Sequence, residues 1–109
     1  MKNNDLTQVD KMKYKSSAIH AVITIFEADM ELRAKALPHV NINAQTINWH
    51  QILKNHFGSG HLAAILWAKS IWTSQQPKDL DIFERSSSMD IHLRKVVLHA
   101  LAIRWGLIS

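Results

Sequence analysis

Apolar residues recur every three or four positions along most of the chain, which is the spacing of an amphipathic helix. In the first such segment the apolar stripe consists of Ile19, Val22, Ile23, Phe26, Met30 and Leu37. Two acid-before-base pairs, each four residues apart, favour a helix over a strand here: Asp29 with Arg33, and Glu31 with Lys35. The pattern therefore predicts one helix, capped by Ser16 or Ser17, that continues to about Leu37.

Three further helices follow from the same spacing, at about 44–56, 61–73 and 89–105. The first of these takes Asn41 or Asn43 as its cap, and the last is ended by Gly106. The one in between is apolar nearly all round, which is typical of a helix at the centre of a domain. The segment LDIFERSSS before the last helix forms at most one helical turn.

These segments predict an all-α fold, with a single compact domain of four to five helices around the apolar helix 61–73. No segment has a persuasive strand pattern. We expect the helical domain to cover 16–109, and the chain length of 109 residues suits one domain. Residues 1–15 are polar and are expected to form a flexible N-terminal arm.

The composition excludes several classes of protein. With 47% apolar and 20% charged residues, the chain is typical of globular proteins. It has no cysteine, which excludes disulfides and thiolate metal sites. The longest uncharged apolar run, Leu62 to Ala68, is far shorter than the ~20 residues that span a bilayer. The polar start also lacks the apolar core of a secretion signal. We therefore expect a soluble, cytoplasmic protein with no membrane partner.

The positive charge of the chain, +4 in total, is concentrated in its middle third. Residues 36–77 contain Lys54 and Lys69 and no acid, together with four of the seven histidines. Such a balance is compatible with nucleic acid or an acidic protein as a partner, and it demands neither.

The histidines and serines do not have the spacing of a metal site or a hydrolase. Two histidine ligands on one helix need a separation of three or four residues, which no two histidines of this chain have. Ser59 lies between two glycines, but the nucleophile elbow of hydrolases follows a strand, and a helix precedes it here. Glu27 and Glu31 are explained by a solvated helix face. We expect no metal, no cofactor and no enzymatic activity.

The stretch HFGSGH (56–61) is expected to join two helices. Gly58 would end one helix in the left-handed conformation, and Ser59 or Gly60 would cap the next. Free N–H groups at the start of a helix favour a bound anion. The candidate anion or nucleic-acid site therefore comprises Lys54, His56, Gly58, Ser59, Gly60 and His61.

Within FGSGHLAAILW, the positions of Gly58, Gly60 and Ala64 resemble the helix-hairpin-helix element of DNA-binding proteins. That element joins two helices by glycine, a hydrophobic residue and glycine, with an alanine four residues after the second glycine. The resemblance implies that the hairpin amides hold a DNA phosphate without reading bases. Ser59 departs from the pattern, because the element has a hydrophobic residue there that anchors the hairpin in the core.

Two further surfaces are candidates for binding. Trp67 and Trp72 are five residues apart and so differ by about 140° around a helix, which favours an interface for part of the tryptophan surface. Filling a compact core is the alternative explanation. The candidate interface residues are Trp49, Trp67, Trp72 and Trp105. A candidate basic face on the last helix consists of His92, Arg94, Lys95 and His99, for which a solvated outer face is the alternative.

Taken together, these features favour a small non-enzymatic interaction protein. It would bind a protein partner, or a second copy of itself, through tryptophan-rich apolar surface. The alternative is a nucleic-acid-binding module in which the turn from Gly58 to Gly60 holds backbone phosphate.

Overall fold

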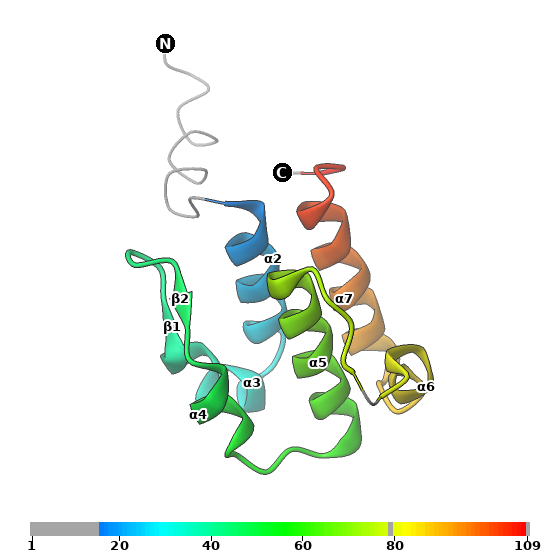
Figure 1. Cartoon of the computed structure of the whole chain (residues 1–109). Coiled ribbons are helices and arrows are strands. Elements are labelled where there is room, and N and C mark those ends of the chain that lie inside the picture. The colour runs from blue at the N-terminus through cyan, green and yellow to red at the C-terminus, as the bar shows by residue number, and fades with distance from the viewer. Residues whose placement is uncertain (1–15, 79, 109) are drawn as a thin grey trace.

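A computed structural model of the chain describes residues 16–78 and 80–108. Within these residues the fold has six α-helices, one 3-10 helix and one two-stranded hairpin (Figure 1). The predicted all-α class is confirmed, and the predicted N-terminal arm, 1–15, lies outside the described residues. In chain order the elements are α2 (Ser17–Phe26), α3 (Met30–Lys35), η1 (Leu37–His39), β1 (Val40–Asn41), β2 (Thr46–Ile47), α4 (Trp49–Leu53), α5 (Ser59–Thr73), α6 (Ile82–Ser86) and α7 (Ile91–Arg104).

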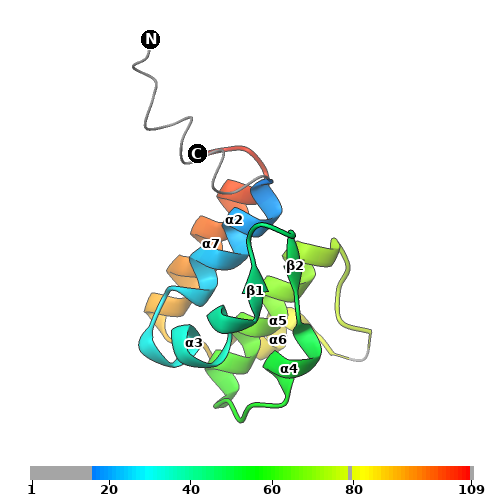
Figure 2. The ribbon, with the colours of Figure 1, turned by 90° about the vertical axis from the view of Figure 1, so that its left-hand side faces the viewer.

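Helices α2, α5 and α7 lie side by side and form the centre of the molecule (Figures 1 and 2). At one end, the Ser17 hydroxyl at the start of α2 donates to the Arg104 carbonyl at the end of α7 (3.4 Å). At the other end, His92 Nε2 donates to the Ala28 carbonyl, just after α2 (2.9 Å). Helix α2 therefore runs antiparallel to α7, and α5 runs parallel to α7.

The core lies between these three helices, and α2 is the most deeply buried of them. It buries the residues Ile19, Ala21, Val22, Ile23, Ile25 and Phe26. Helix α5, which the sequence places at the centre, contacts α2, α6 and α7. It buries Ala63, Ala64, Ile65, Ala68 and Ile71. Because three of these are alanines, the neighbouring helices can approach α5 closely.

The prediction of a single helix over 17–37 is wrong, because the helix is interrupted between α2 and α3. Helix α2 ends at Phe26, and Asp29 then takes an extended conformation with φ −152°. The Asp29 carboxylate accepts a hydrogen bond from the Leu32 N–H at 2.9 Å and so begins a new helix. An aspartate that caps a helix start is thus indistinguishable, from spacing alone, from one on a helix face.

The break also changes the two predicted charge pairs. Glu31 and Lys35 pair at 3.2 Å, as predicted. Arg33 instead donates to the Glu27 carbonyl at the end of α2, at 3.2 Å, so its predicted pairing with Asp29 is wrong. The arginine satisfies one of the last carbonyls of α2, which is a favourable place for a cation.

The helix predicted over 44–56 is also wrong in its extent, because a β-hairpin takes up its first residues. Val40 pairs with Ile47, and Asn41 pairs with Thr46, in an antiparallel register. Apolar and polar residues alternate through HVNIN, which is a strand pattern rather than a connector. Only the five residues of α4 remain helical.

Asparagines fix both the hairpin turn and the start of α4. The Asn41 side chain accepts a hydrogen bond from the Ala44 N–H at 2.9 Å, inside the turn. The Asn48 side chain accepts one from the Gln51 N–H at 3.2 Å and caps α4. The prediction that Asn41 or Asn43 caps this helix is therefore wrong, because both residues belong to the hairpin.

The two glycines of HFGSGH have roles other than those predicted. Gly58 does not end a helix in the left-handed conformation: its φ is −64°, and it is the N-cap residue of α5. Gly60 lies inside the first turn of α5 rather than capping it. A Cβ at Gly60 would lie 2.6 Å from the Ser88 carbonyl oxygen, so this glycine allows α5 to approach the start of α7.

Helix α7 is closed at both ends by local sequence signals. The Asp90 carboxylate accepts a hydrogen bond from the Leu93 N–H at 2.8 Å and starts the helix. Gly106 ends it in the left-handed conformation, with φ +75°, as predicted. The N–H groups of Gly106 and Leu107 both donate back into the last turn, which is the Schellman arrangement.

Candidate functional site

The residues of the HFGSGH turn (56–61) lie between α4 and α5 and contact α3. Lys54, His56 and Ser59 are exposed there. Lys35 reaches the turn from α3 and donates to the His56 carbonyl at 2.7 Å and to Glu31 at 3.2 Å. Its ammonium group also lies 5.4 Å from the centre of the Phe57 ring, so Lys35 contacts the turn through both a hydrogen bond and an aromatic ring.

His61 connects the turn to two carboxylates. Its Nε2 atom lies 2.5 Å from Asp29 Oδ2, and its Nδ1 atom lies 4.0 Å from Glu31 Oε1. Partial burial by itself would raise the pKa of the Asp29 carboxyl. Hydrogen bonds from the Leu32 amide and from His61, together with the charge of His61, outweigh that burial and lower the pKa below its usual value.

The predicted anion site therefore has acidic neighbours that its own sequence segment lacks. Segment 36–77 contains no acid, but α3 brings Asp29 and Glu31 to the start of α5. These carboxylates contact both ring nitrogens of His61, which is one of the basic residues of the predicted site. The local charge at this helix start is consequently much less positive than the sequence indicates.

The same contacts bear on nucleophilic chemistry at Ser59. A histidine that activates a serine needs one ring nitrogen for the hydroxyl and the other for an orienting acid. In His61 both ring nitrogens face carboxylates, those of Asp29 and Glu31.

In the part of the chain that the structure describes, no three histidine, aspartate or glutamate side chains form a group that could hold a metal ion.

The four tryptophans proposed as interface residues fall into two groups. Trp49, Trp67 and Trp72 are half-buried and pack against the core. Trp49 meets the Phe26 ring edge to face at 5.9 Å, and its buried Nε1 has no hydrogen-bond partner among the described residues. Trp105, in contrast, is 67% exposed at the end of α7.

Trp67 is held in place by α6. Its indole N–H donates to the Ser86 hydroxyl at 2.6 Å, and its ring meets Phe83 edge to face at 5.6 Å. Phe83 itself is largely exposed. The Trp67 contact explains why α6 packs against α5, so this tryptophan has a structural role that its position in the sequence did not reveal.

Helix α7 carries a row of exposed apolar side chains along its outer side. Ile91, Leu98 and Trp105 are 71%, 68% and 67% exposed, respectively. They are seven residues apart, so they lie one above another on the helix. The opposite side of α7 is buried by Leu93, Val97, Ala100 and Ile103. The helix therefore has two apolar sides, and the fold covers only one of them.

The predicted basic face lies on this same side of α7. At about 100° per residue, Arg94 and Lys95 lie on opposite sides of the apolar row, one turn after its first member. His99 follows Leu98 on the side of Lys95, and all three are exposed. One residue of the candidate interface, Trp105, and three of the candidate basic face thus lie on one surface. We call it the outer face of α7 and define it as Ile91, Arg94, Lys95, Leu98, His99 and Trp105.

Two other basic residues of α7 make hydrogen bonds to neighbouring segments of the fold. His92 contacts the Ala28 carbonyl, as described above, and lies at the edge of the outer face. Arg104 donates to the Ile71 carbonyl and to the Ser74 hydroxyl, both at 3.3 Å. It thereby caps the end of α5, where a cation is favoured. Arg94 donates to the Ser87 carbonyl at 3.1 Å and keeps its exposed position.

The signal for the apolar row was present in the sequence. Ile91, Leu98 and Trp105 recur every seven residues, so on a helix they lie along one line. Trp105 is among the predicted interface residues, but the prediction did not connect it with Ile91 or Leu98. A helix with apolar residues on both sides needs the packing of the whole fold to show which side is left uncovered.

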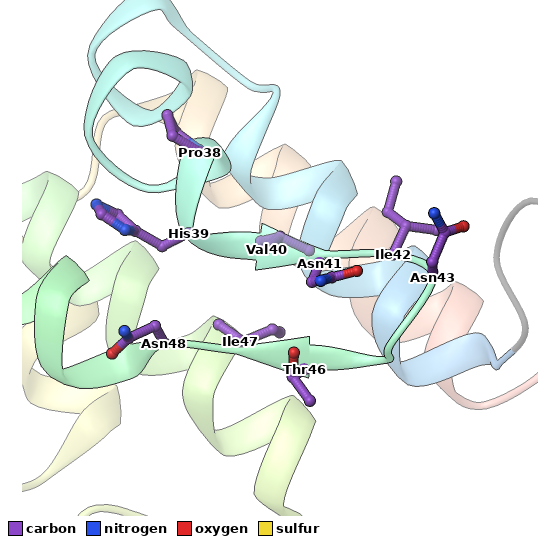
Figure 3. Close-up of a pocket in the computed structure, with 9 residues that line it drawn as sticks. All are labelled: Pro38, His39, Val40, Asn41, Ile42, Asn43, Thr46, Ile47 and Asn48. Atoms are coloured by element: carbon purple, nitrogen blue, oxygen red, sulfur yellow. The ribbon is translucent and has the colours of Figure 1, made fainter.

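The hairpin forms a shallow, open hollow of about 760 Å³. Its lining residues are Pro38, His39, Val40, Asn41, Ile42, Asn43, Thr46, Ile47 and Asn48. In Figure 3 these side chains fan out from both strands rather than converging on one point. The side-chain oxygens of Asn41 and Asn48 already accept backbone hydrogen bonds. The hollow follows from the shape of the hairpin and presents no set of convergent polar groups.

Comparison of the chain with protein-family models, with curated proteins and with solved structures finds no match. None of the helices in residues 16–78 and 80–108 is both long enough and apolar enough to cross a bilayer. The predicted cytoplasmic location stays a prediction. The function must therefore be inferred from the surface of the chain itself.

Proposed function

We propose that the protein is a non-enzymatic interaction protein that binds a protein partner, or a second copy of itself, through the outer face of α7. The observation that carries the proposal is the row of Ile91, Leu98 and Trp105, each about two-thirds exposed or more. Large exposed apolar side chains aligned on one side of a helix favour an interface, whereas scattered ones are ordinary surface. Tryptophan is the side chain most enriched among residues that dominate binding energy.

The row is also well placed for binding. Each of the three side chains contributes about 1.5–3 kcal/mol when an interface removes it from water. The buried side of α7 packs against α2 and α5, so the helix is fixed before any partner arrives. A preformed helix loses little conformational entropy on binding, and more of the burial energy is left for affinity.

The experiment is a selection of peptide binders from a displayed library of helical peptides, with the full chain as bait. Binders are compared on two variants with equivalent changes, Leu98→Glu on the outer face and Met30→Glu at a more exposed site on α3. We expect binding to be lost on Leu98→Glu and retained on Met30→Glu. Binders that tolerate Leu98→Glu would place the interaction surface elsewhere.

Self-association is tested in parallel by the mass of the chain in solution. A mass of twice 12.5 kDa that returns to 12.5 kDa in Leu98→Glu supports a second copy as the partner. A monomer that also yields no peptide binder dependent on Leu98 contradicts the proposed function. Both measurements use the full chain, and circular dichroism confirms that each variant is folded.

The nucleic-acid alternative stays a prediction for the HFGSGH turn. The exposed basic residues Lys54 and His56 favour it, and the carboxylates of Asp29 and Glu31 beside His61 disfavour it. A gel shift with duplex and single-stranded DNA tests it, because phosphate binding weakens steeply as salt rises. Absence of any shift at low salt removes this alternative.

A further inference from the structure

We infer that the partner of the outer face of α7 is an acidic amphipathic helix of another protein. The inference rests on the proposed function and adds the chemistry of the occupant. Its apolar residues would pack along the row of Ile91, Leu98 and Trp105, and its carboxylates would meet the cations beside that row.

The charge of the outer face has one sign. Residues 91–109 contain three lysines or arginines and no acid. Arg94 and Lys95 flank the apolar row, one on each side, and His99 adds a third basic group. Among the described residues, no carboxylate lies within 4.0 Å of these three side chains. A partner that buries the row must therefore supply the acids, because cations that are desolvated without counter-charges destabilise a complex.

The dimensions of the row fit one helix. From Ile91 to Trp105 it is about 21 Å long, at about 1.5 Å per residue, which is four turns of a partner helix. One large exposed apolar residue appears every seven positions; Arg94 and Lys95 lie in the turn between Ile91 and Leu98, and Leu101 and Ala102 in the turn between Leu98 and Trp105. The row therefore supplies one of the two apolar positions per seven residues that a helix-helix seam uses, with charges beside it that would select the partner. A helix that inserts into a lipid surface instead has a wide apolar face with its charges on the opposite side.

Two other occupants are disfavoured by their charge. A second copy packed along the same row would bring the cations of both copies to one seam, with no carboxylate of the outer face to meet them. The N-terminal segment 1–15 of this chain carries four lysines and two aspartates, so it is itself positive. Like charges across an interface are repulsive, and the acidic partner is the occupant that the surface complements.

Two matched probe peptides test the inference against the full chain. Each is a three-heptad helix of about 21 residues with leucine at the seam positions. One carries glutamate at the flanking positions, and the other carries lysine there. Fluorescence anisotropy of the labelled peptides gives both affinities. We expect the glutamate peptide to bind about tenfold more tightly or better, and its affinity to fall as salt rises.

Variants of the chain separate charge from apolar contact. The double change Arg94→Glu with Lys95→Glu is expected to reverse the preference, so that the lysine peptide binds more tightly. The change Leu98→Glu is expected to abolish binding of both peptides, and Met30→Glu is the matched control that leaves both unchanged. Arg94→Gln with Lys95→Gln is a milder pair that should remove the preference without reversing it.

The outcomes distinguish the inference from the proposed function. Equal affinity for both peptides, or a preference that the charge reversal does not change, overturns the acidic partner. If neither peptide binds but the chain forms dimers that Leu98→Glu disrupts, the occupant is a second copy, and the proposed function stands without the inference. Binding of the chain to vesicles of anionic phospholipid, with no peptide binding, overturns both in favour of a lipid surface. Peptide binding that survives Leu98→Glu also overturns both.

Discussion

The HFGSGH turn and the outer face of α7 are both basic in the sequence, and the fold treats them in opposite ways. At the turn, α3 brings Asp29 and Glu31 against His61, and Lys35 against the His56 carbonyl. On the outer face of α7, among the described residues, no acid reaches the cations. A basic segment thus indicates a binding surface only where its neighbours in the fold leave the charge uncompensated.

The difference originates in the break between α2 and α3. A continuous helix over 17–37 would have directed Asp29 along the same helix toward Arg33. Because Asp29 caps a new helix instead, its carboxylate lies at the start of α5, where it meets His61. The turn is therefore held to α3 by several polar contacts, whereas the outer face of α7 contributes one, from Arg94 to the Ser87 carbonyl.

The largest of these effects on stability is expected at the glycines of the turn. Substituting each in turn tests whether it is needed for packing. Gly60→Ser places a Cβ 2.6 Å from the Ser88 carbonyl oxygen and should lower the free energy of unfolding by about 1–3 kcal/mol. Gly58→Ser meets no atom within 4 Å and supplies a capping hydroxyl, so stability should be unchanged or higher. Urea unfolding measures both, and equal losses would contradict the packing role of Gly60.

A somewhat smaller effect is expected from Asp29, which joins the turn to α3. Asp29→Ala removes the cap of α3 and the partner of His61, and should lower the free energy of unfolding by about 1–2 kcal/mol. Asp29→Asn keeps a capping oxygen but not the charge, and should lose less. If both variants are as stable as the wild type, the contacts between α3 and the turn do not hold this region.

The charge of Asp29 also predicts a dependence on pH. Its pKa is lowered in the folded chain, so the stabilising contribution is fully present above the unfolded value of about 3.9. It is lost as the pH falls through the lower folded pKa. The stability difference between wild type and Asp29→Asn should therefore shrink as the pH is lowered from about 5, as measured by urea unfolding. A difference that grows with acidity would contradict the assigned pairing.

The smallest effect on stability is expected from the outer face of α7. Leu98 is 68% exposed, so Leu98→Gln should change the free energy of unfolding by no more than about 0.5 kcal/mol. Leu93→Gln, on the buried side of the same helix, is the contrasting variant and should destabilise strongly. Thermal unfolding of the two variants measures this difference. An equal loss of stability in both would show that Leu98 also contributes to the fold.

Much of this fold could be predicted from the sequence, where the signals are local. The end of α7 at Gly106 and the apolar character of α5 both follow from nearby residues. The break at Asp29 could not be predicted from spacing, because an aspartate that caps a helix has the same position in the pattern as one on a helix face, and its second partner, His61, is 32 residues away. The hairpin was missed although apolar and polar residues alternate through HVNIN, because the alternation covers only five residues and each strand is two residues long.

The candidate site was harder to predict for the same physical reason. Trp67 and Trp105 look alike in the sequence, but Ser86 and Phe83 cover one of them and nothing in the described chain covers the other. Ile91 and Leu93 are both apolar residues in the first turn of α7. Only the positions of α2 and α5 determine which of them faces the core.

The most direct test is to map the glutamate probe peptide onto the full chain by NMR chemical shifts. We predict that the largest shifts occur at Ile91, Leu98 and the indole of Trp105, with little change at Gly58 and Gly60. That result would assign binding to the outer face of α7, where charge and apolar surface are left uncovered. Shifts centred on the turn, or none at all as the peptide is added, would contradict the account.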